Sequence, residues 1–421
     1  MALTLSTANA VLKNDYQGAI REQLNNNCFL LSQIDKNTKD VVGSRAAHAV
    51  HIKRSSAVGA RADGGTLPTA GNQTYLQPYI PIRSNYARIQ ITGKTIEAMK
   101  SDRGAFTRAI KSEMDGARND EGRDVNRQVF GTSNGVIAQC GTTSSSTTVV
   151  LASTTDLAAL YQLFNDGGMI VDIGTVASPT TVAEARTVTS VDLDAKTLVI
   201  SGAAVTTSSS HFLFRTGTGG DSDESGLEND GQIELTGIRH IVDDATTLHQ
   251  ISQSTYPVWK ATVKGNSGTN RNLSEALVST AYHTANRKSG KFVDLMVCSD
   301  GVQRAAAALM TSMRRNVDTV DLKAGYSGMR WSFTGEGDKM GKPLALKWDQ
   351  DCPGNRIFGL ATSELVEYVM LDWTWDDTDG NVLSRVQNQD AFEAFLKKYH
   401  ELACIQRNAH FVVEDLNEVN A

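Results

Sequence analysis

The chain has 421 residues and a formal net charge of −6, with 40% hydrophobic and 21% charged residues. This is the composition of a globular protein with room for two or three domains. No apolar run approaches the ~20 residues that span a bilayer, and no basic stretch followed by an apolar one marks a signal peptide, so we expect neither.

The cysteines and the distribution of charge along the chain indicate the redox compartment and a possible mode of self-association. The five cysteines lie far apart in the sequence, which favours a reducing compartment over a disulfide framework. Residues 1–100 contain twelve Lys/Arg and six Asp/Glu, whereas the remainder contains 29 and 41. A basic leading segment and an acidic body would attract each other between neighbouring copies, although a chance asymmetry on solvated faces explains the counts equally well.

Two extended segments lead the chain. Residues 1–45 form an arm with a modest helical pattern (Val11, Leu12, Tyr16, Ile20, Leu24) and too few apolar residues for a core of its own. Residues 46–92 read as a long two-stranded excursion with a Gly-rich, polar tip between residues 57 and 73. An isolated hairpin is marginal in water, so we expect it to lie on a partner surface.

A long amphipathic helix follows at residues 101–131. Its apolar positions recur every three or four residues and include Phe106, Ile110, Met114, Ala117, Val125 and Val129. Ser101 or Asp102 is the expected N-cap and Gly131 the expected stop. Interior glycines such as Gly116 and Gly122 cost about 1 kcal/mol each and suggest bending or a close backbone approach.

A β-rich block occupies residues 149–216. It opens with a short helical segment, DLAALYQLFN, and continues with short β-runs separated by turns, of which Asp192–Lys196 joins two strands as a hairpin. We expect a small β-barrel or curled sheet that is inserted between segments belonging together.

From Asn272 the pattern becomes α/β. LSEALVSTAYHTANRKSG is an expected helix capped by Asn272 or Ser274, KFVDLMVCS a buried strand, and DGVQRAAAALMTSMRR a helix capped by Ser299 or Asp300. Further strands are expected in GMRWSFTG, LALKWD, RIFGLAT and LVEYVML. The final stretch, 389–416, is expected to contain a strand-like entry, a helix fragment and a closing β-run, HFVVEDL.

The search for catalytic and metal-binding motifs is nearly empty. GEGDKMGKP near Gly335 has the wrong spacing for a phosphate loop, with Pro343 where Ser or Thr should bind magnesium. Asp221, Asp223 and Gly226 match half a calcium loop, but Gln232 stands where its glutamate belongs. His48 and His51 point to opposite faces of a strand. We therefore predict no enzyme activity, no cofactor and no metal site.

The ordered set of segments resembles the major capsid proteins of tailed bacteriophages, the Hong Kong 97-type fold. The best local matches are GAFTRAIKSEMDGARNDEGRDVNRQVFG, STYPVWKATV at 254–263 and DAFEAFLKKYHELACIQRNAHFVVEDL at 390–416. The resemblance implies an α+β fold divided as follows: an N-arm at 1–45, an E-loop at 46–92, a peripheral domain with a spine helix at 93–148, a β-barrel-like insertion at 149–218, a peripheral return at 219–271, an axial α/β domain at 272–350 and a return through both domains at 351–421.

The resemblance also implies a function and partners. The chain would self-assemble as pentamers and hexamers into an icosahedral shell around the double-stranded DNA of a tailed phage, which it would contact without sequence specificity. Portal, scaffolding and decoration proteins are the other implied partners, in a virion assembled in the host cytoplasm and with no membrane. Because Met1 directly precedes the arm, scaffolding is expected to be a separate protein or absent. An encapsulin-like nanocompartment protein is the alternative, and a secreted β-rich binding protein a distant one.

Charged side chains on the hairpin and the long helix are the expected contacts between subunits: Lys53, Arg54, Arg61, Asp63, Arg118, Asp120, Glu121 and Arg123. Some members of this family join subunits by an isopeptide bond from a hairpin lysine. Here the hairpin has one lysine, Lys53, on the stem beside Arg54, and the tip carries Arg61, which stays protonated. We therefore expect a shell held without covalent bonds.

Overall fold

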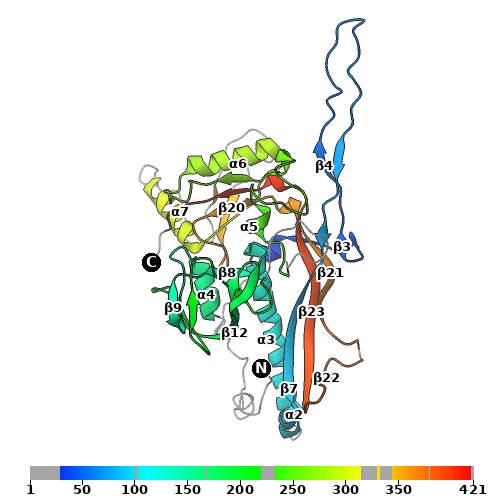
Figure 1. Ribbon diagram of the computed structural model, residues 1–421. Helices are drawn as coiled ribbons and strands as arrows, with labels where there is room; N and C mark the ends of the chain where they lie inside the picture. The colour runs from blue at the N-terminus through cyan, green and yellow to red at the C-terminus, as the bar shows by residue number, and fades with distance from the viewer. Residues whose placement is uncertain are drawn as a thin grey trace, which may run out of the picture.

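The computed structural model describes residues 29–99, 103–165, 168–219, 233–313, 330–331, 344–378 and 380–418. Figure 1 shows a mixed α+β body from which a narrow two-stranded arm projects. The helical pattern at Val11–Leu24, the acidic loop near Asp221 and the glycine-rich stretch near Gly335 lie outside these residues.

The expected long helix is present as α3 (Arg103–Phe130) and ends before Gly131 as predicted. Val125 and Val129 are fully buried, whereas Ile110, Met114 and Ala117 are only half-buried. A Cβ atom added at Gly116 or Gly122 would meet nothing within 4 Å, so close backbone approach does not explain these glycines.

A long twisted sheet covers α3, with strand order β1-β21-β23-β22 and β7 paired to β23. Helix α2 (Gly93–Met99) directly follows β7 in the chain and contacts α3. The strands are β1 (Asp35–Asn37), β7 (Arg83–Thr92), β21 (Leu365–Trp375), β22 (Ser384–Arg385) and β23 (Ala391–Cys404).

Strand β23 corrects the sequence analysis, which expected a helix fragment within residues 389–416. All ten residues of β7 pair with β23 on one edge, and β21 pairs with it on the other. The two neighbours satisfy its backbone groups on both sides, and this tertiary pairing overrides the local helix propensity of Glu, Leu, Lys and Ala. Because β7 belongs to this sheet, the expected excursion at 46–92 ends about ten residues earlier than predicted.

The second sheet has strand order β16-β24-β20-β17-β19-β18 and carries α6 and α7. The predicted helix cap at Ser274 is confirmed, since its side chain accepts from the Leu277 N–H and Gly290 closes α6 in the left-handed conformation. Segments from 262 to 413 contribute to the sheet, so it extends on both sides of the expected 272–350 unit. Its elements are β16 (Thr262–Lys264), β17 (Leu295–Cys298), β18 (Arg330–Trp331), β19 (Leu344–Trp348), β20 (Ile357–Leu360), β24 (Phe411–Val413), α6 (Glu275–Ser289) and α7 (Asp300–Met313).

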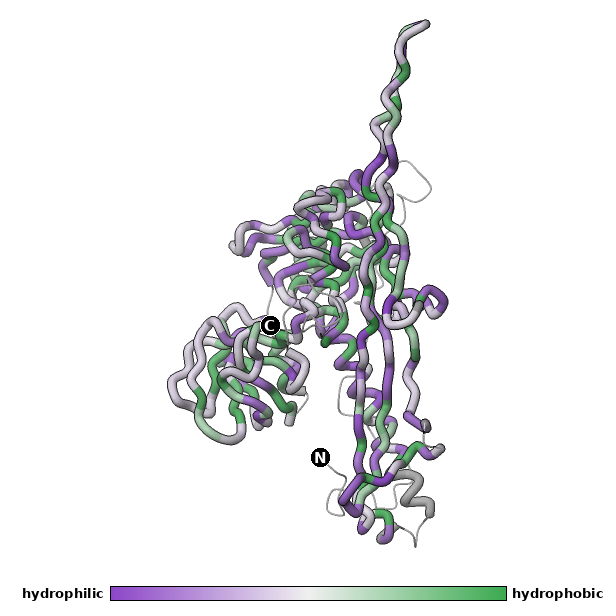
Figure 2. The backbone as a smooth tube through the Cα atoms, turned by 45° about the vertical axis from the view of Figure 1, so that its right-hand side comes forward, coloured by the Kyte–Doolittle hydropathy of each residue, from purple (hydrophilic) through white to green (hydrophobic). Residues whose placement is uncertain are grey.

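The β-rich block forms a lobe of its own (Figure 2). Its main sheet runs β10-β13-β12-β11-β15-β8, and β14 pairs with β9 beside it. Because β8 pairs with β15, and β9 with β14, the lobe begins near residue 136 and not at 149 as expected. Its elements are β8 (Val136–Gln139), β9 (Thr143–Ser146), β10 (Thr148–Val150), α4 (Leu157–Asn165), β11 (Ile170–Thr175), β12 (Ser178–Asp192), β13 (Thr197–Ile200), β14 (Val205–Thr207) and β15 (Phe212–Arg215).

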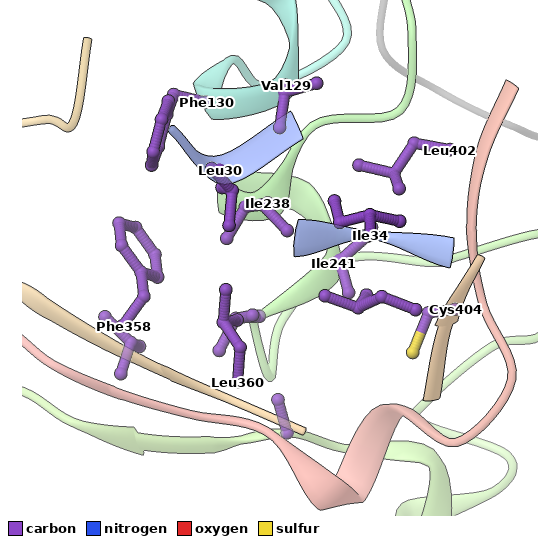
Figure 3. Packing of buried hydrophobic residues seen from close by; sticks show 14 of the residues in the cluster. Leu30, Ile34, Val129, Phe130, Ile238, Ile241, Phe358, Leu360, Leu402 and Cys404 are labelled. Atoms are coloured by element: carbon purple, nitrogen blue, oxygen red, sulfur yellow. The ribbon is translucent and has the colours of Figure 1, made fainter. Parts of the chain in front are cut away.

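One apolar core connects the end of α3 to both sheets (Figure 3). It contains Phe130 from α3, Leu30 from η1 (Leu30–Gln33), Ile238 from α5 (Ile238–Ile241), Leu360 from β20 and Leu402 from β23. Gly237 packs directly on the Gly131 carbonyl, where any side chain would clash. Three short helices also belong to the body: η2 (Pro257–Trp259), η4 (Thr362–Glu364) and η5 (Arg407–Ala409).

Candidate functional site: the hairpin arm and the buried end of the long helix

The arm is a hairpin whose stem strands are β4 (Val50–Lys53) and β5 (Thr74–Leu76), and we call residues 50–76 the hairpin arm. It extends away from both sheets in Figures 1 and 2. Val58 and Leu67 on its tip are 79% and 81% exposed. The tip of the hairpin arm therefore presents two large apolar side chains to solvent.

The tip is shaped by its own hydrogen bonds. Gln73 Oε1 accepts from the Ser55 N–H at 3.1 Å and lies 2.8 Å from His51 Nε2, so the two strands stay joined beyond the stem. Arg61 donates to the carbonyls of Thr66 and Ala60 at 3.0 and 2.9 Å. The guanidinium therefore fixes the tip and still presents its charge outward.

The base of the arm is anchored to the body. A small sheet of β2 (Val41–Val42), β3 (Arg45–Ala46) and β6 (Ile80–Pro81) lies below the stem. His48 stacks on Tyr368 of β21 with ring centroids 6.3 Å apart, and burial lowers the pKa of this histidine. The Tyr79 N–H donates to the His249 carbonyl at 3.1 Å. The arm thus projects from a fixed base.

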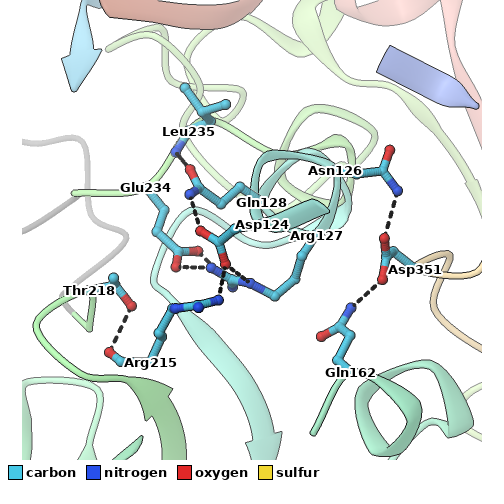
Figure 4. A network of polar contacts seen from close by, with 10 residues as sticks. All are labelled: Asp124, Asn126, Arg127, Gln128, Gln162, Arg215, Thr218, Glu234, Leu235 and Asp351. Carbon is cyan, nitrogen blue, oxygen red and sulfur yellow. Dashed lines mark hydrogen bonds and ion pairs between the residues drawn. The ribbon is translucent and has the colours of Figure 1, made fainter. Parts of the chain in front are cut away.

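The C-terminal end of α3 carries a buried ionic network (Figure 4). Arg127 binds Glu234 through two nitrogens at 3.1 and 2.5 Å and Asp124 at 3.0 Å. Arg215 of β15 reaches the same Asp124 oxygen at 2.8 Å. The two guanidinium groups hold the pKa of Asp124 well below its usual range despite its burial, so the carboxylate stays charged.

A second chain of polar contacts leaves the same helix on its other side. Asn126 donates to Asp349 at 3.0 Å and to Asp351 at 2.6 Å, and Gln162 of α4 donates to Asp351 at 2.9 Å. The two networks therefore tie the lobe, through α4 and β15, to the long helix and to the loop after β19.

The eight expected contact residues divide into two groups. Lys53, Arg54, Arg61 and Asp63 on the arm and Arg118 and Asp120 on α3 are exposed. Glu121 and Arg123 are only 9% and 7% exposed, so their assignment as surface contacts is wrong. The lobe and β7 cover this turn of the helix. The charge pattern along the helix cannot show that other segments pack over it. Burial and the nearby Asp124 raise the pKa of Glu121 to about 7.

A polar cavity lies beside the buried end of the long helix. A cavity of about 410 Å³ between β7, α3 and β15 is lined mostly by polar side chains, including Glu121 and Asp124.

Across the described ranges, no group of three or more His, Cys, Asp or Glu side chains could hold a metal ion. The helices that the structure describes are all too short or too polar to cross a membrane. Cys140, Cys298, Cys352 and Cys404 are buried free thiols.

Comparison with known proteins identifies the architecture. No protein-family model and no curated protein matches the chain. Among solved structures, the capsid of cyanophage A-1(L) is 13% identical over 98% of this chain and 99% of its own, with a TM-score of 0.58. The capsid of a native GTA particle is 10% identical over 96% of both chains (TM-score 0.48), and the SrpI encapsulin complex of Synechococcus elongatus is 7% identical over 99% and 97% (TM-score 0.44). The full-length agreement with the cyanophage capsid shows that this chain has the Hong Kong 97-type fold.

Proposed function

We propose that this chain, with its Hong Kong 97-type fold, is the major capsid protein of a tailed phage, a structural shell protein without enzyme activity. The observation that carries the proposal is the hairpin arm, which exposes Val58 and Leu67 far from the body of a fold shared end to end with a phage capsid structure. Copies of the chain would form pentamers and hexamers, and these would enclose double-stranded DNA.

The arm supports self-assembly through its charge as well as its apolar tip. Lys53, Arg54 and Arg61 outnumber Asp63 along it, whereas the chain beyond residue 100 carries an excess of acidic residues. A basic arm lying on the acidic body of a neighbour would bury the apolar tip and offset both charges. In this arrangement Arg118 and Asp120 on α3 are further contact candidates, because both are exposed.

The remaining partners follow from this role. A portal, a scaffolding protein and decoration proteins would complete a virion assembled in the host cytoplasm. The acidic body argues for weak, salt-dependent contact with the packaged DNA and against sequence-selective binding.

Electron microscopy of the purified protein and of lysate from producing cells tests the proposal. DNA-filled icosahedral shells, some with tails, are expected. Shells filled with protein would favour a nanocompartment instead, and a monodisperse chain that forms no shell under any assembly condition would overturn both.

A further inference from the structure

A second cavity, of about 260 Å³, lies where the lobe meets the second sheet. Helix α4, the end of β19 and the start of α7 form its walls, with Tyr161, Trp348 and Ser299 among the lining residues. The hydrogen bond from Gln162 to Asp351 ties α4 to the loop after β19, so the distance between these walls is fixed.

The rim of this cavity is aromatic and exposed. Tyr161, Phe164 and Trp348 are 46%, 54% and 42% exposed. Tyr161 and Phe164 are three residues apart on α4 and share one helix face, and Trp348 lines the cavity from β19. Tyr161 and Trp348 line the cavity, and Phe164 continues the same face of α4 beyond it; we call these three exposed side chains the aromatic rim.

The carboxylates around the cavity already have partners. Asp300 pairs with Arg304 at 3.0 Å, and Glu418 accepts from the Ser299 hydroxyl and from the Asn355 N–H. Asp349 accepts from Asn126 and from the backbone of Leu30. These carboxylates are engaged with protein partners, and Tyr161 and Trp348 add exposed apolar surface to the cavity.

The described chain begins at this place. Leu30 donates its backbone N–H to Asp349 at 3.3 Å, and the Phe29 ring lies 6.0 Å from the Lys347 ammonium. Asp349 also lines the cavity, so the first residues that the structure describes lie next to its wall. Six residues span up to about 20 Å, which brings Leu24 and the residues before it within reach.

We propose that the aromatic rim and its cavity are the docking site of the chain's own N-terminal segment, residues 11–24. The apolar positions of this segment, Val11, Leu12, Tyr16, Ile20 and Leu24, recur at helical spacing, and the segment has no core of its own. The attachment at Leu30 makes docking intramolecular, so its effective concentration exceeds that of a second copy in solution. The site is a property of the single chain and holds whether or not the chain forms shells.

Hydrogen exchange on the full-length, unassembled chain tests the docking. We compare wild type with Tyr16→Asp/Ile20→Asp, which places charge among the apolar positions, and with Asn14→Asp/Gly18→Asp, which adds the same charge away from them. Exchange across residues 157–165 and 344–352 should accelerate about tenfold in the first variant and stay at the wild-type rate in the second. Equal rates in all three proteins would overturn the proposal, as would equal acceleration in both variants.

Photo-crosslinking identifies which copy supplies the segment. A benzophenone-bearing residue replaces Tyr16 in a mixture of unlabelled and ¹⁵N-labelled chains. Crosslinks to 157–165 or 344–352 should join peptides of the same isotope. Mixed-isotope crosslinks would show that a second copy occupies the rim, and crosslinks only elsewhere would show that the segment docks at another place; either result contradicts the assignment. Because the chains are unassembled, neither outcome depends on the capsid function.

Discussion

At the scale of single residues, α3 contains buried and exposed arginines that the sequence alone does not distinguish. Arg127 is 7% exposed and is held by two carboxylates, whereas Arg118, two and a half turns earlier on the same helix, is exposed. Both arginines read as ordinary members of a charged helix face. Only Arg127 neutralises carboxylates that the fold has removed from water, and this difference sets what each contributes to stability.

Replacing Arg127 by methionine should therefore be strongly destabilising. The substitution preserves most of the side-chain volume but leaves Glu234 and Asp124 buried with one guanidinium fewer, at a cost of about 3–5 kcal/mol. Urea unfolding of the purified subunit measures the loss. The matched variant Arg118→Met should stay within about 0.5 kcal/mol of wild type; similar midpoints for both variants would contradict the role of the network.

Replacing Glu121 should have the opposite effect and stabilise the subunit. Its pKa rises from 4.5 to about 7 in the folded chain because burial and Asp124 disfavour the charge. Below pH 4.5 the group is protonated in the folded and unfolded states and contributes nothing, whereas above pH 7 the folded state carries the full penalty. Glu121→Gln should therefore stabilise the subunit at pH 8 by on the order of 2 kcal/mol, with the gain vanishing near pH 4.5.

Unfolding midpoints measured from pH 4.5 to 8 check this dependence. Asp115→Asn, at an exposed position on the same helix, provides the control and should follow the wild-type curve. A pH-independent gain from Glu121→Gln would contradict the assigned cause.

At the scale of elements, the hairpin arm and the lobe are appendages that the two sheets do not need. The arm beyond its stem bonds chiefly to itself, and the lobe has its own apolar core built around residues such as Leu160, Val171 and Leu213. Each appendage should therefore be removable while the rest of the chain stays folded, with different consequences for assembly.

Deleting residues 57–73 should leave a folded subunit that forms no stable shells. The deletion removes Val58, Leu67 and Arg61 but spares the stem and its anchors at His48 and Tyr79. Circular dichroism and thermal melting should match wild type, while electron microscopy shows no shells. A Gly/Ser tip of the same length is the control for chain length and should also fail. Normal shells from either protein would refute the role of the tip.

Replacing the lobe requires the boundary that the structure shows. A short Gly/Ser linker in place of 136–218 removes β8 and β9 together with their partners, so both sheets and α3 should stay folded and resist protease. The same linker in place of 149–218 leaves β8 and β9 without β15 and β14, and we expect that protein to aggregate. Global unfolding of the 136–218 replacement would show that α3 depends on the lobe, for which the bond from Arg215 to Asp124 is the first candidate.

At the scale of the whole molecule, shells of this chain would be held by buried area, strand pairing and charge complementarity. Lys53 is exposed beside Arg54 on the stem, whereas an amine that attacks a carbonyl must be neutral, for which a dry pocket is the usual means. The four described cysteines are buried, so they are poorly placed for disulfides between subunits.

Purified particles boiled in detergent with reductant should therefore give one band near 45.4 kDa. Omitting the reductant should leave the pattern unchanged, which separates disulfides from other covalent links. A ladder of dimers to hexamers that survives boiling with reductant would establish a covalent shell.

The sequence by itself determined the elements whose signals are local. The existence and the end of α3, the Ser274 cap of α6 and the uniformly apolar β17 each depend on neighbours in the chain, and each is confirmed. The continuous apolar face expected along α3 is not, because Ile110, Met114 and Ala117 are only half-buried. The α+β class and the fold were expected from the resemblance of the ordered segments to tailed-phage capsid proteins, and the full-length likeness to a phage capsid structure confirms both.

Only the tertiary structure decided which segments pair and which charges are buried. β23 is a strand because β7, from the first quarter of the chain, bonds to one of its edges while β21 bonds to the other, and β8 joins the lobe because β15 returns to it. Glu121 and Arg123 are buried because the lobe and β7 cover their turn of α3. The charge pattern of this helix is that of a solvent-exposed one. The physical reason is common to all of these: backbone pairing and desolvation are set by partners distant in the chain, and local propensity carries no information about them.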